Sequence, residues 1–274
     1  MDFFRTPRVL NDPAAYAGWQ QSEHAGRRDT PPGSPRGSSS FSMHSLHEAL
    51  PGLRSRSPSP KPSGHWYGPG AAEMHQREQE WAHLSARTLR HHPADAQAGQ
   101  AIHDLSLVYA GSETFRRTMA TVDAEGPVNV RVDPEVSTAY FRPHGREVVL
   151  GQAYTGSRPY AMGVLAFELT NASLSEAYSA HEREAAMRRM SPHEFAEGAE
   201  RIEYNSVRDT HRYYEESRGV LYEAGLDVPQ AWQSSVTEEG EVVPWTGSED
   251  ESVHNAMSTG HFGQYAQSYA RRPY

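Results

Sequence analysis

A single carboxylate, Glu168, lies within the most apolar stretch of the chain, residues 160–178. Burying a carboxylate costs several kcal/mol unless it is paired, protonated or bound to a metal. Asn171 follows one helical turn later and shares a helix face with Glu168. A buried Glu with a raised pKa is a candidate general base, and an Asn amide can donate to a substrate carbonyl or oxyanion. We therefore take Glu168 and Asn171 as candidate catalytic residues, with Glu203 and Tyr204 of the next long helix on the opposite wall.

The alternative role for Glu168 and Asn171 is structural. A buried polar pair that hydrogen-bonds a neighbouring helix fixes the register of the two helices. On this interpretation Arg201, Tyr204 or Arg208 supplies the hydrogen-bond partner. The sequence leaves the catalytic and the structural interpretation open.

The sequence predicts neither a metal ion nor a cofactor. The chain has no cysteine, which excludes thiolate metal sites and a cysteine nucleophile. No two of its 15 histidines have the i, i+4 spacing that places two imidazoles on one helix face. There is also no Gly-rich phosphate loop and no nucleophile elbow. The histidines that flank the helices of Glu168 and Glu203 are His181, His193 and His211, and His91, His92 and His103 lie upstream.

The elements that must position these residues follow from hydrophobic periodicity. Helical spacing predicts helices over residues 71–92, 95–110 and 112–120. Alternating valines predict a strand over 128–132, and a turn at 142–146 predicts a β-hairpin between 138–141 and 147–151.

Two helices should follow the hairpin. The apolar stretch 160–178 reads as the first. A capping box at Ser191-Pro192-His193-Glu194 opens the second, which should run to about Arg218. We expect an α+β domain, mostly helical with a small sheet, over residues 71–227.

This order of elements resembles the core of zincin metallopeptidases. In that family the metal helix carries His-Glu-x-x-His within a frame such as x-x-Leu-Ala-His-Glu-Leu-x-His-Ala. Here the frame is VLAFELTNA, residues 164–172, so FELTN stands in place of HExxH. The resemblance covers about 90 residues, from Val128 to Ser217, and the chain is also similar to bacterial toxin and effector domains with a Phe-Glu-x-x-Asn-Ala core.

The departures from the zincin pattern matter for activity. Phe167 and Asn171 occupy the positions of the two zinc-binding histidines, and only Glu168 remains. The resemblance maps a third ligand to Glu200 or Glu203. It therefore implies a pseudo-peptidase, and zinc peptidase activity of the usual kind is not expected.

Composition separates the expected domain from its flanks. Residues 1–70 are rich in Ser, Pro, Gly and Arg, and we expect them to be disordered, as we do much of the polar, acidic segment 228–274. Eight basic residues across residues 1–70 are too sparse to predict nucleic-acid binding. No apolar run is long enough to predict a membrane span.

The chain has the features of a secreted bacterial effector or toxin. Residues 1–70 resemble the Ser-rich, unfolded secretion segment of type III effectors, which implies a secretion chaperone there and action in the host-cell cytoplasm. Lys61 is the only lysine. A GC-rich genome, which favours Arg codons, explains this, and so does delivery into a foreign cytosol, where few lysines mean few ubiquitination sites. The leading expectation is a domain that binds a host protein or peptide. The alternatives are a metal-independent hydrolase or deamidase-like enzyme using Glu168, and a regulatory or structural protein that is not secreted.

Overall fold

The structure is a computed structural model that describes residues 70–136, 138–143, 145–259 and 261–270. The disorder and the secretion segment expected for residues 1–70 therefore fall, except for residue 70, outside the described residues. None of the described helices has the length and apolar character needed to cross a lipid bilayer.

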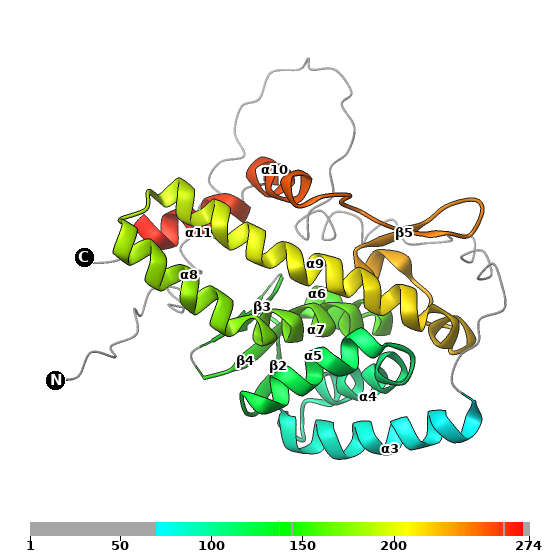
Figure 1. The fold of residues 1–274 in the computed structure, drawn as a ribbon. Helices are drawn as coiled ribbons and strands as arrows, with labels where there is room; N and C mark the ends of the chain where they lie inside the picture. Colours follow the sequence, from blue (N-terminus) through cyan, green and yellow to red (C-terminus); the bar gives the residue numbers. More distant parts are fainter. Residues whose placement is uncertain (1–69, 137, 144, 260, 271–274) are drawn as a thin grey trace.

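The described chain is an α+β structure, mostly helical with a small sheet, as expected (Figure 1). Its α-helices are α3 (Ala71–Thr88), α4 (Ala96–Gly111), α5 (Glu113–Ala124), α6 (Gln152–Thr155), α7 (Arg158–Ser173), α8 (Ser175–Arg188), α9 (Pro192–Glu223), α10 (Glu249–Thr259) and α11 (His261–Ala270), and a 3₁₀-helix, η2, spans Pro229–Trp232.

The main sheet has four strands in the order β1-β2-β4-β3. They are β1 (Leu89–Arg90), β2 (Val128–Asp133), β3 (Ala139–Arg142) and β4 (Glu147–Gly151). The predicted strand and hairpin are confirmed, because β3 and β4 pair antiparallel, with Phe141 opposite Val148. Strand β2 pairs parallel with both β1 and β4. Because β3 lies at the edge of the sheet, it pairs with one strand only.

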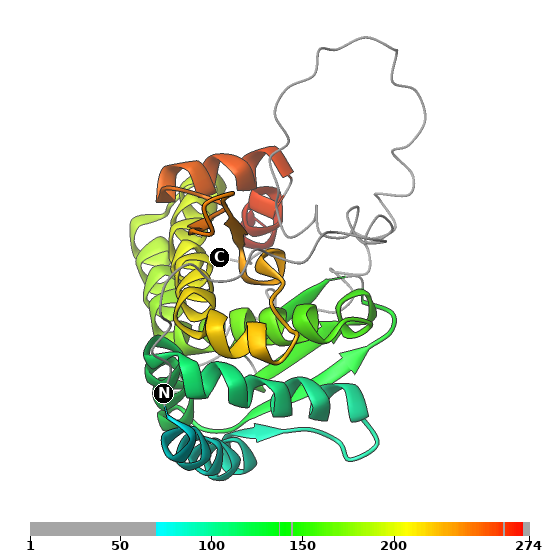
Figure 2. The ribbon, with the colours of Figure 1, turned by 90° about the vertical axis from the view of Figure 1, so that its right-hand side faces the viewer.

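Helix α7 is the central element of the core. Twelve of its sixteen residues are buried, which is typical of a helix covered on all sides. It packs against α4, α5 and α9 and against strands β3 and β4 (Figure 2). Its first residue, Arg158, forms two hydrogen bonds with the carboxylate of Asp104, which is 2% exposed. This ion pair ties the start of α7 to α4.

The predicted apolar helix over 160–178 is in fact two helices. Helix α7 ends at Ser173, and α8 begins at Ser175. Leu174 takes φ −97° and ψ 9°, which is not helical, and its N–H donates to the carbonyls of Thr170 and Asn171. The last turn of α7 therefore tightens and redirects the chain, although the residues on both sides favour helix.

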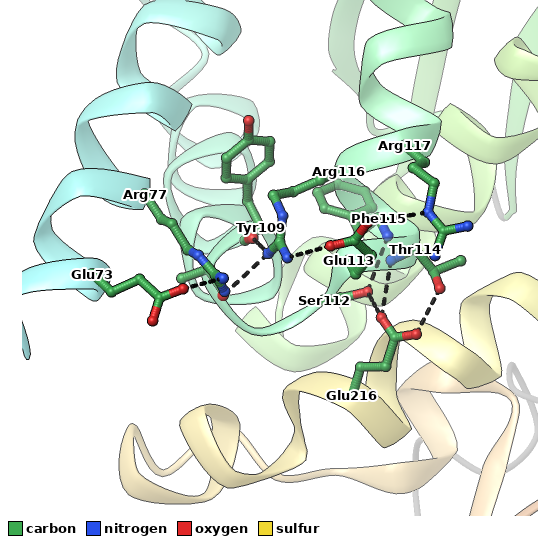
Figure 3. Close-up of polar contacts among 11 residues, drawn as sticks. Glu73, Arg77, Tyr109, Ser112, Glu113, Thr114, Phe115, Arg116, Arg117 and Glu216 are labelled. Atoms are coloured by element: carbon green, nitrogen blue, oxygen red, sulfur yellow. Dashed lines mark hydrogen bonds and ion pairs between the residues drawn. The ribbon is translucent and has the colours of Figure 1, made fainter. Parts of the chain in front are cut away.

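Helix α9 runs along the described part of the chain and is its longest element (Figure 1). The predicted capping box is confirmed. The Ser191 N–H donates to the Glu194 carboxylate at 2.8 Å, and the Glu194 N–H donates to Ser191 Oγ. Near its other end, Glu216 accepts hydrogen bonds from Ser112 Oγ and from the N–H of Thr114 at 2.6 and 3.0 Å (Figure 3). The Glu216 carboxylate thus satisfies donors at the start of α5.

The expectation of a largely disordered segment after residue 227 is wrong for the described residues 228–259 and 261–270. They form η2, a small antiparallel sheet of β5 (Ser234–Val236) and β6 (Val242–Pro244), and helices α10 and α11. Trp232 is fully buried in the main core, and Phe262 and Tyr269 are buried against α9. Apolar residues in this segment are few, but Trp232, Phe262 and Tyr269 are large and bury enough surface to hold it in place.

Candidate functional site

Glu168 lies on the buried side of α7 and is 3% exposed. Its Oε2 accepts a hydrogen bond from Asn171 Nδ2 at 3.0 Å, and its carboxylate also accepts one from the backbone N–H of Phe141 on β3. Burial raises the pKa of Glu168 to about 8, with a smaller contribution from the charge of Glu203, although the hydrogen bond from Asn171 opposes the shift. Glu168 is therefore protonated in most molecules at neutral pH.

Asn171 joins Glu168 to the neighbouring helix. Its Oδ1 accepts a hydrogen bond from Ser206 Oγ of α9 at 2.7 Å, while its Nδ2 donates to Glu168. The amide is therefore fixed at both ends, and its orientation holds the Glu168 carboxyl in place.

The prediction that Arg201, Tyr204 or Arg208 of α9 is the hydrogen-bond partner of Glu168 and Asn171 is wrong. Arg201 forms ion pairs with Glu197, Glu249 and Asp250, and Arg208 pairs with Asp209. Tyr204 is half-buried, and none of the contacts within the described residues joins it to Glu168 or Asn171. Ser206 takes the place expected for these longer side chains.

A second group of ionisable residues lies next to Glu168. Glu200 and Glu203 are three residues apart on α9 and therefore share one face of that helix. His261, the first residue of α11, places Nδ1 2.9 Å from Glu200 Oε1 and Nε2 3.9 Å from Glu203 Oε2. Glu203 lies one turn before Ser206, which donates to Asn171, and the charges of Glu203 and His261 both act on Glu168, so the two groups adjoin. We call Glu168, Asn171, Glu200, Glu203 and His261 the carboxylate–imidazole site.

The carboxylates of this site are buried more deeply than its imidazole. The side chains of Glu200 and Glu203 are 6% and 15% exposed, whereas that of His261 is 38% exposed. Burial raises the pKa of Glu203, with Glu200 adding to the shift and His261 opposing it. Burial lowers the pKa of His261, but the charges of Glu203 and Glu200 outweigh it and raise the pKa overall. At neutral pH His261 is therefore a cation between two carboxylates.

Two tyrosines border the site. Tyr265 donates a hydrogen bond to Glu203 Oε2 at 2.8 Å, and a further hydrogen bond joins Tyr178 to Tyr265. Burial and then the charge of Glu203 raise the pKa of both phenols well above the usual value. Both side chains therefore stay neutral at physiological pH and act as hydrogen-bond donors.

The three histidines expected near the helices of Glu168 and Glu203 make packing or hydrogen-bond contacts elsewhere. His181 stacks on Phe195 and lies 2.8 Å from its carbonyl oxygen. His193 packs edge-on against Phe262. His211 Nδ1 lies 2.9 Å from Ser234 Oγ.

The structure thus brings Glu168, Asn171 and Glu203 together and leaves Tyr204 outside the site. Sequence reasoning missed His261 and Tyr265, because both lie in the segment expected to be disordered. The signal that could have found them is local: His261 and Tyr265 are four residues apart, on a helix whose Phe262 and Tyr269 are buried.

Compared with protein-family models, with curated proteins and with solved structures, the chain matches none of them.

Proposed function

We propose that the chain is an enzyme that hydrolyses an amide or ester bond, with Glu168 as the residue that transfers the proton. The observation that carries the proposal is the convergence of Glu168, from the buried helix α7, with the Glu203 and His261 side chains of two other helices. Buried carboxylates grouped with an imidazole are typical of sites that move protons. Of the functions expected from the sequence, this geometry favours the hydrolase or deamidase-like alternative.

The protonation of Glu168 defines its role. Because its pKa is about 8, the carboxyl can donate a proton to a leaving nitrogen or oxygen, and its ionised form can then accept one from water. A group whose pKa lies near the working pH serves both steps.

Asn171 acts on Glu168 in this proposal. The sequence suggested that its amide donates to a substrate oxygen, but its Nδ2 donates to Glu168 Oε2. Asn171 is therefore a positioning residue, and its link to Ser206 sets the direction of the Glu168 carboxyl.

The test is an unbiased search for products in cells that express the full chain. Hydrolysis of backbone amides creates new peptide termini, and hydrolysis of side-chain amides converts Asn or Gln to Asp or Glu; proteome-wide mass spectrometry detects both. We expect products with the wild type and with Glu215→Gln, a control at an exposed position of α9. Glu168→Gln should abolish them, because the amide cannot transfer a proton. The proposal fails if Glu168→Gln yields the same products or if the wild type yields none.

Delivery into a host cell is a separate proposal. Its support is the Ser-, Pro- and Arg-rich composition of residues 1–70. Residues 1–70 fused to a reporter should be translocated by a type III secretion system, alongside a working positive control. A fusion that stays in the bacterium would remove this proposal and leave the enzymatic one unchanged. If translocation succeeds while Glu168→Gln keeps the full cellular phenotype, the domain acts by binding a host protein.

A further inference from the structure

The side chains of Glu200, Glu203 and His261 form a compact set of metal-ligating groups. One ligand atom from each lies within 4.8 Å of the other two. A metal ion about 2.0–2.2 Å from each of three ligands needs those atoms roughly 3–4 Å apart. Small rotations of the side chains, together with release of the His261 proton, therefore suffice to enclose an ion. The two carboxylates come from adjacent turns of α9, and the imidazole comes from α11, so the set is built by tertiary structure.

We infer that Glu200, Glu203 and His261 bind one divalent transition-metal ion, of the Zn²⁺ or Mn²⁺ class, beside Glu168. The inference deepens the proposed function, since the ion would activate a water molecule for the same hydrolysis. The binding itself can be measured without any substrate.

The charge balance of the site supports a cation. Glu200 and Glu203 are two largely buried carboxylates, and His261 is the one basic side chain among the described residues that forms an ion pair with them. Within the described ranges, no arginine or lysine forms an ion pair with either carboxylate. Buried carboxylates are stabilised by a counter-charge, and a divalent ion supplies two positive charges at one point.

Burial and orientation separate this set from a surface group of acids. The Glu200 side chain is 6% exposed, whereas His261 is 38% exposed, so an ion can reach the site from the side of His261. Tyr265 donates a hydrogen bond to Glu203, which fixes the direction of that carboxylate. Hydrogen bonds of this kind to ligating side chains are a regular feature of metal sites in proteins.

The ligand types restrict the metal. One imidazole nitrogen and two carboxylates suit Zn²⁺, Mn²⁺ or Fe²⁺, whereas Mg²⁺ and Ca²⁺ favour sites made of oxygen alone. The set also differs from the zincin arrangement, because its ligands come from α9 and α11. On α7, Phe167 cannot bind a metal, and Asn171 is held by Glu168 and Ser206.

The first experiment is a calorimetric titration of the metal-stripped, full-length protein with ZnCl₂ and with MnCl₂. MgCl₂ is the comparison. We expect one equivalent of Zn²⁺ to bind with a Kd on the order of micromolar or tighter. Glu203→Gln and His261→Gln should each weaken binding by about 100-fold or more, because each removes a ligand. His254→Gln, at an exposed position of α10, is the matched control and should bind as the wild type does.

The second experiment needs no variant, so misfolding cannot obscure it. Hydrogen exchange followed by mass spectrometry reports the protection of each helix. Zn²⁺ should increase the protection of α11, which carries His261, in the wild-type protein, and MgCl₂ should not. Equal protection of α11 with and without Zn²⁺, or wild-type affinity in both ligand variants, would overturn the inference.

Failure of the metal site and failure of the proposed function can be told apart. If zinc binds but Glu168→Gln keeps its cellular products, the hydrolase proposal fails and the metal site stands. If zinc does not bind but Glu168→Gln loses its products, the metal site fails and the buried cluster holds a proton instead.

Discussion

His261 Nδ1 lies 2.9 Å from Glu200 Oε1, although 61 residues separate the two in the chain. The contact requires α11 to pack along α9, and stacked rings hold it there: Phe195 and Tyr269 have centroids 4.4 Å apart at 13°. A packing contact between aromatic rings thus positions the imidazole against the carboxylates. The chemistry of the site therefore depends on the stability of the last described helix.

The first prediction concerns the docking of α11. Tyr269 is 2% exposed and donates a hydrogen bond to the carbonyl of Ala185. Tyr269→Ala should cost about 3–5 kcal/mol of docking energy, because it removes a buried aromatic ring. Hydrogen exchange should show α11 losing protection while α7 keeps it. Met257→Ala, at a side chain that is 42% exposed, should leave both unchanged. Equal protection of α11 in Tyr269→Ala and the wild type would contradict the packing described here.

The elements with strong local signals were predictable. The capping box at Ser191 and the alternating valines of β2 specify a helix start and a strand within a few residues. Helix α11 carries only a weaker signal, with Phe262, Tyr265 and Tyr269 at helical spacing, and α10 buries only two small apolar residues, Val253 and Ala256. Their order comes from contacts with α9, which a single sequence does not reveal.

The second prediction concerns the pH dependence of stability at Glu168. Its pKa is raised from 4.5 to about 8 in the folded chain, so the unfolded chain ionises first as the pH rises. The folded state then binds more protons than the unfolded state, and stability falls between about pH 4.5 and pH 8.

Glu168→Gln removes this loss, since Gln is neutral and nearly the same shape as the protonated Glu. The variant should be more stable than the wild type by about 1–3 kcal/mol at high pH and nearly equal to it in acid. Urea unfolding at both ends of the range measures this difference. Glu215→Gln should give no such trend. A wild-type advantage that grows with pH would show that Glu168 is stabilised as an anion.

The third prediction concerns Glu216 at the start of α5 (Figure 3). Burial opposes ionisation of Glu216, but hydrogen bonds from Ser112 and Thr114 outweigh it and lower the pKa overall. The folded pKa lies below the unfolded value, so the carboxylate stabilises the fold above about pH 4.5, and this contribution is lost in acid. Glu216→Gln should cost about 1–2 kcal/mol at neutral pH.

The measurement is the free energy of unfolding of wild type and Glu216→Gln at neutral and acidic pH. The gap between them should shrink in acid, because the wild type then loses its charge as well. Glu215→Gln, the exposed neighbour, should differ little from the wild type at either pH. A gap that stays constant with pH would mean that the charge of Glu216 is not what stabilises α5.

The candidate site was predictable only in part, and for a physical reason. Glu168 could be found because a carboxylate among apolar residues on a helix requires a partner or a proton. The surroundings of Glu168 could not be predicted, because the packing of three helices brings Glu203 and His261 towards it. Arg201 and Arg208, which seemed suitable partners on α9, instead pair with acidic residues nearby on α9 or on α10.

The fourth prediction tests whether η2 packs on α7 as described. A Cβ added at Gly163 would lie 1.9 Å from the carbonyl oxygen of Ala231, which is backbone and cannot rotate away. In a helix interior, Gly→Ala normally stabilises by up to about 1 kcal/mol. Here the steric conflict should reverse the sign, and Gly163→Ala should destabilise the fold by about 1–3 kcal/mol. Gly156→Ala is the matched control, because a Cβ at Gly156 meets nothing within 4 Å. Thermal unfolding of both variants gives the comparison. If Gly163→Ala raised the Tm as Gly156→Ala should, the segment around Ala231 would not lie against α7, and the core would end before residue 228.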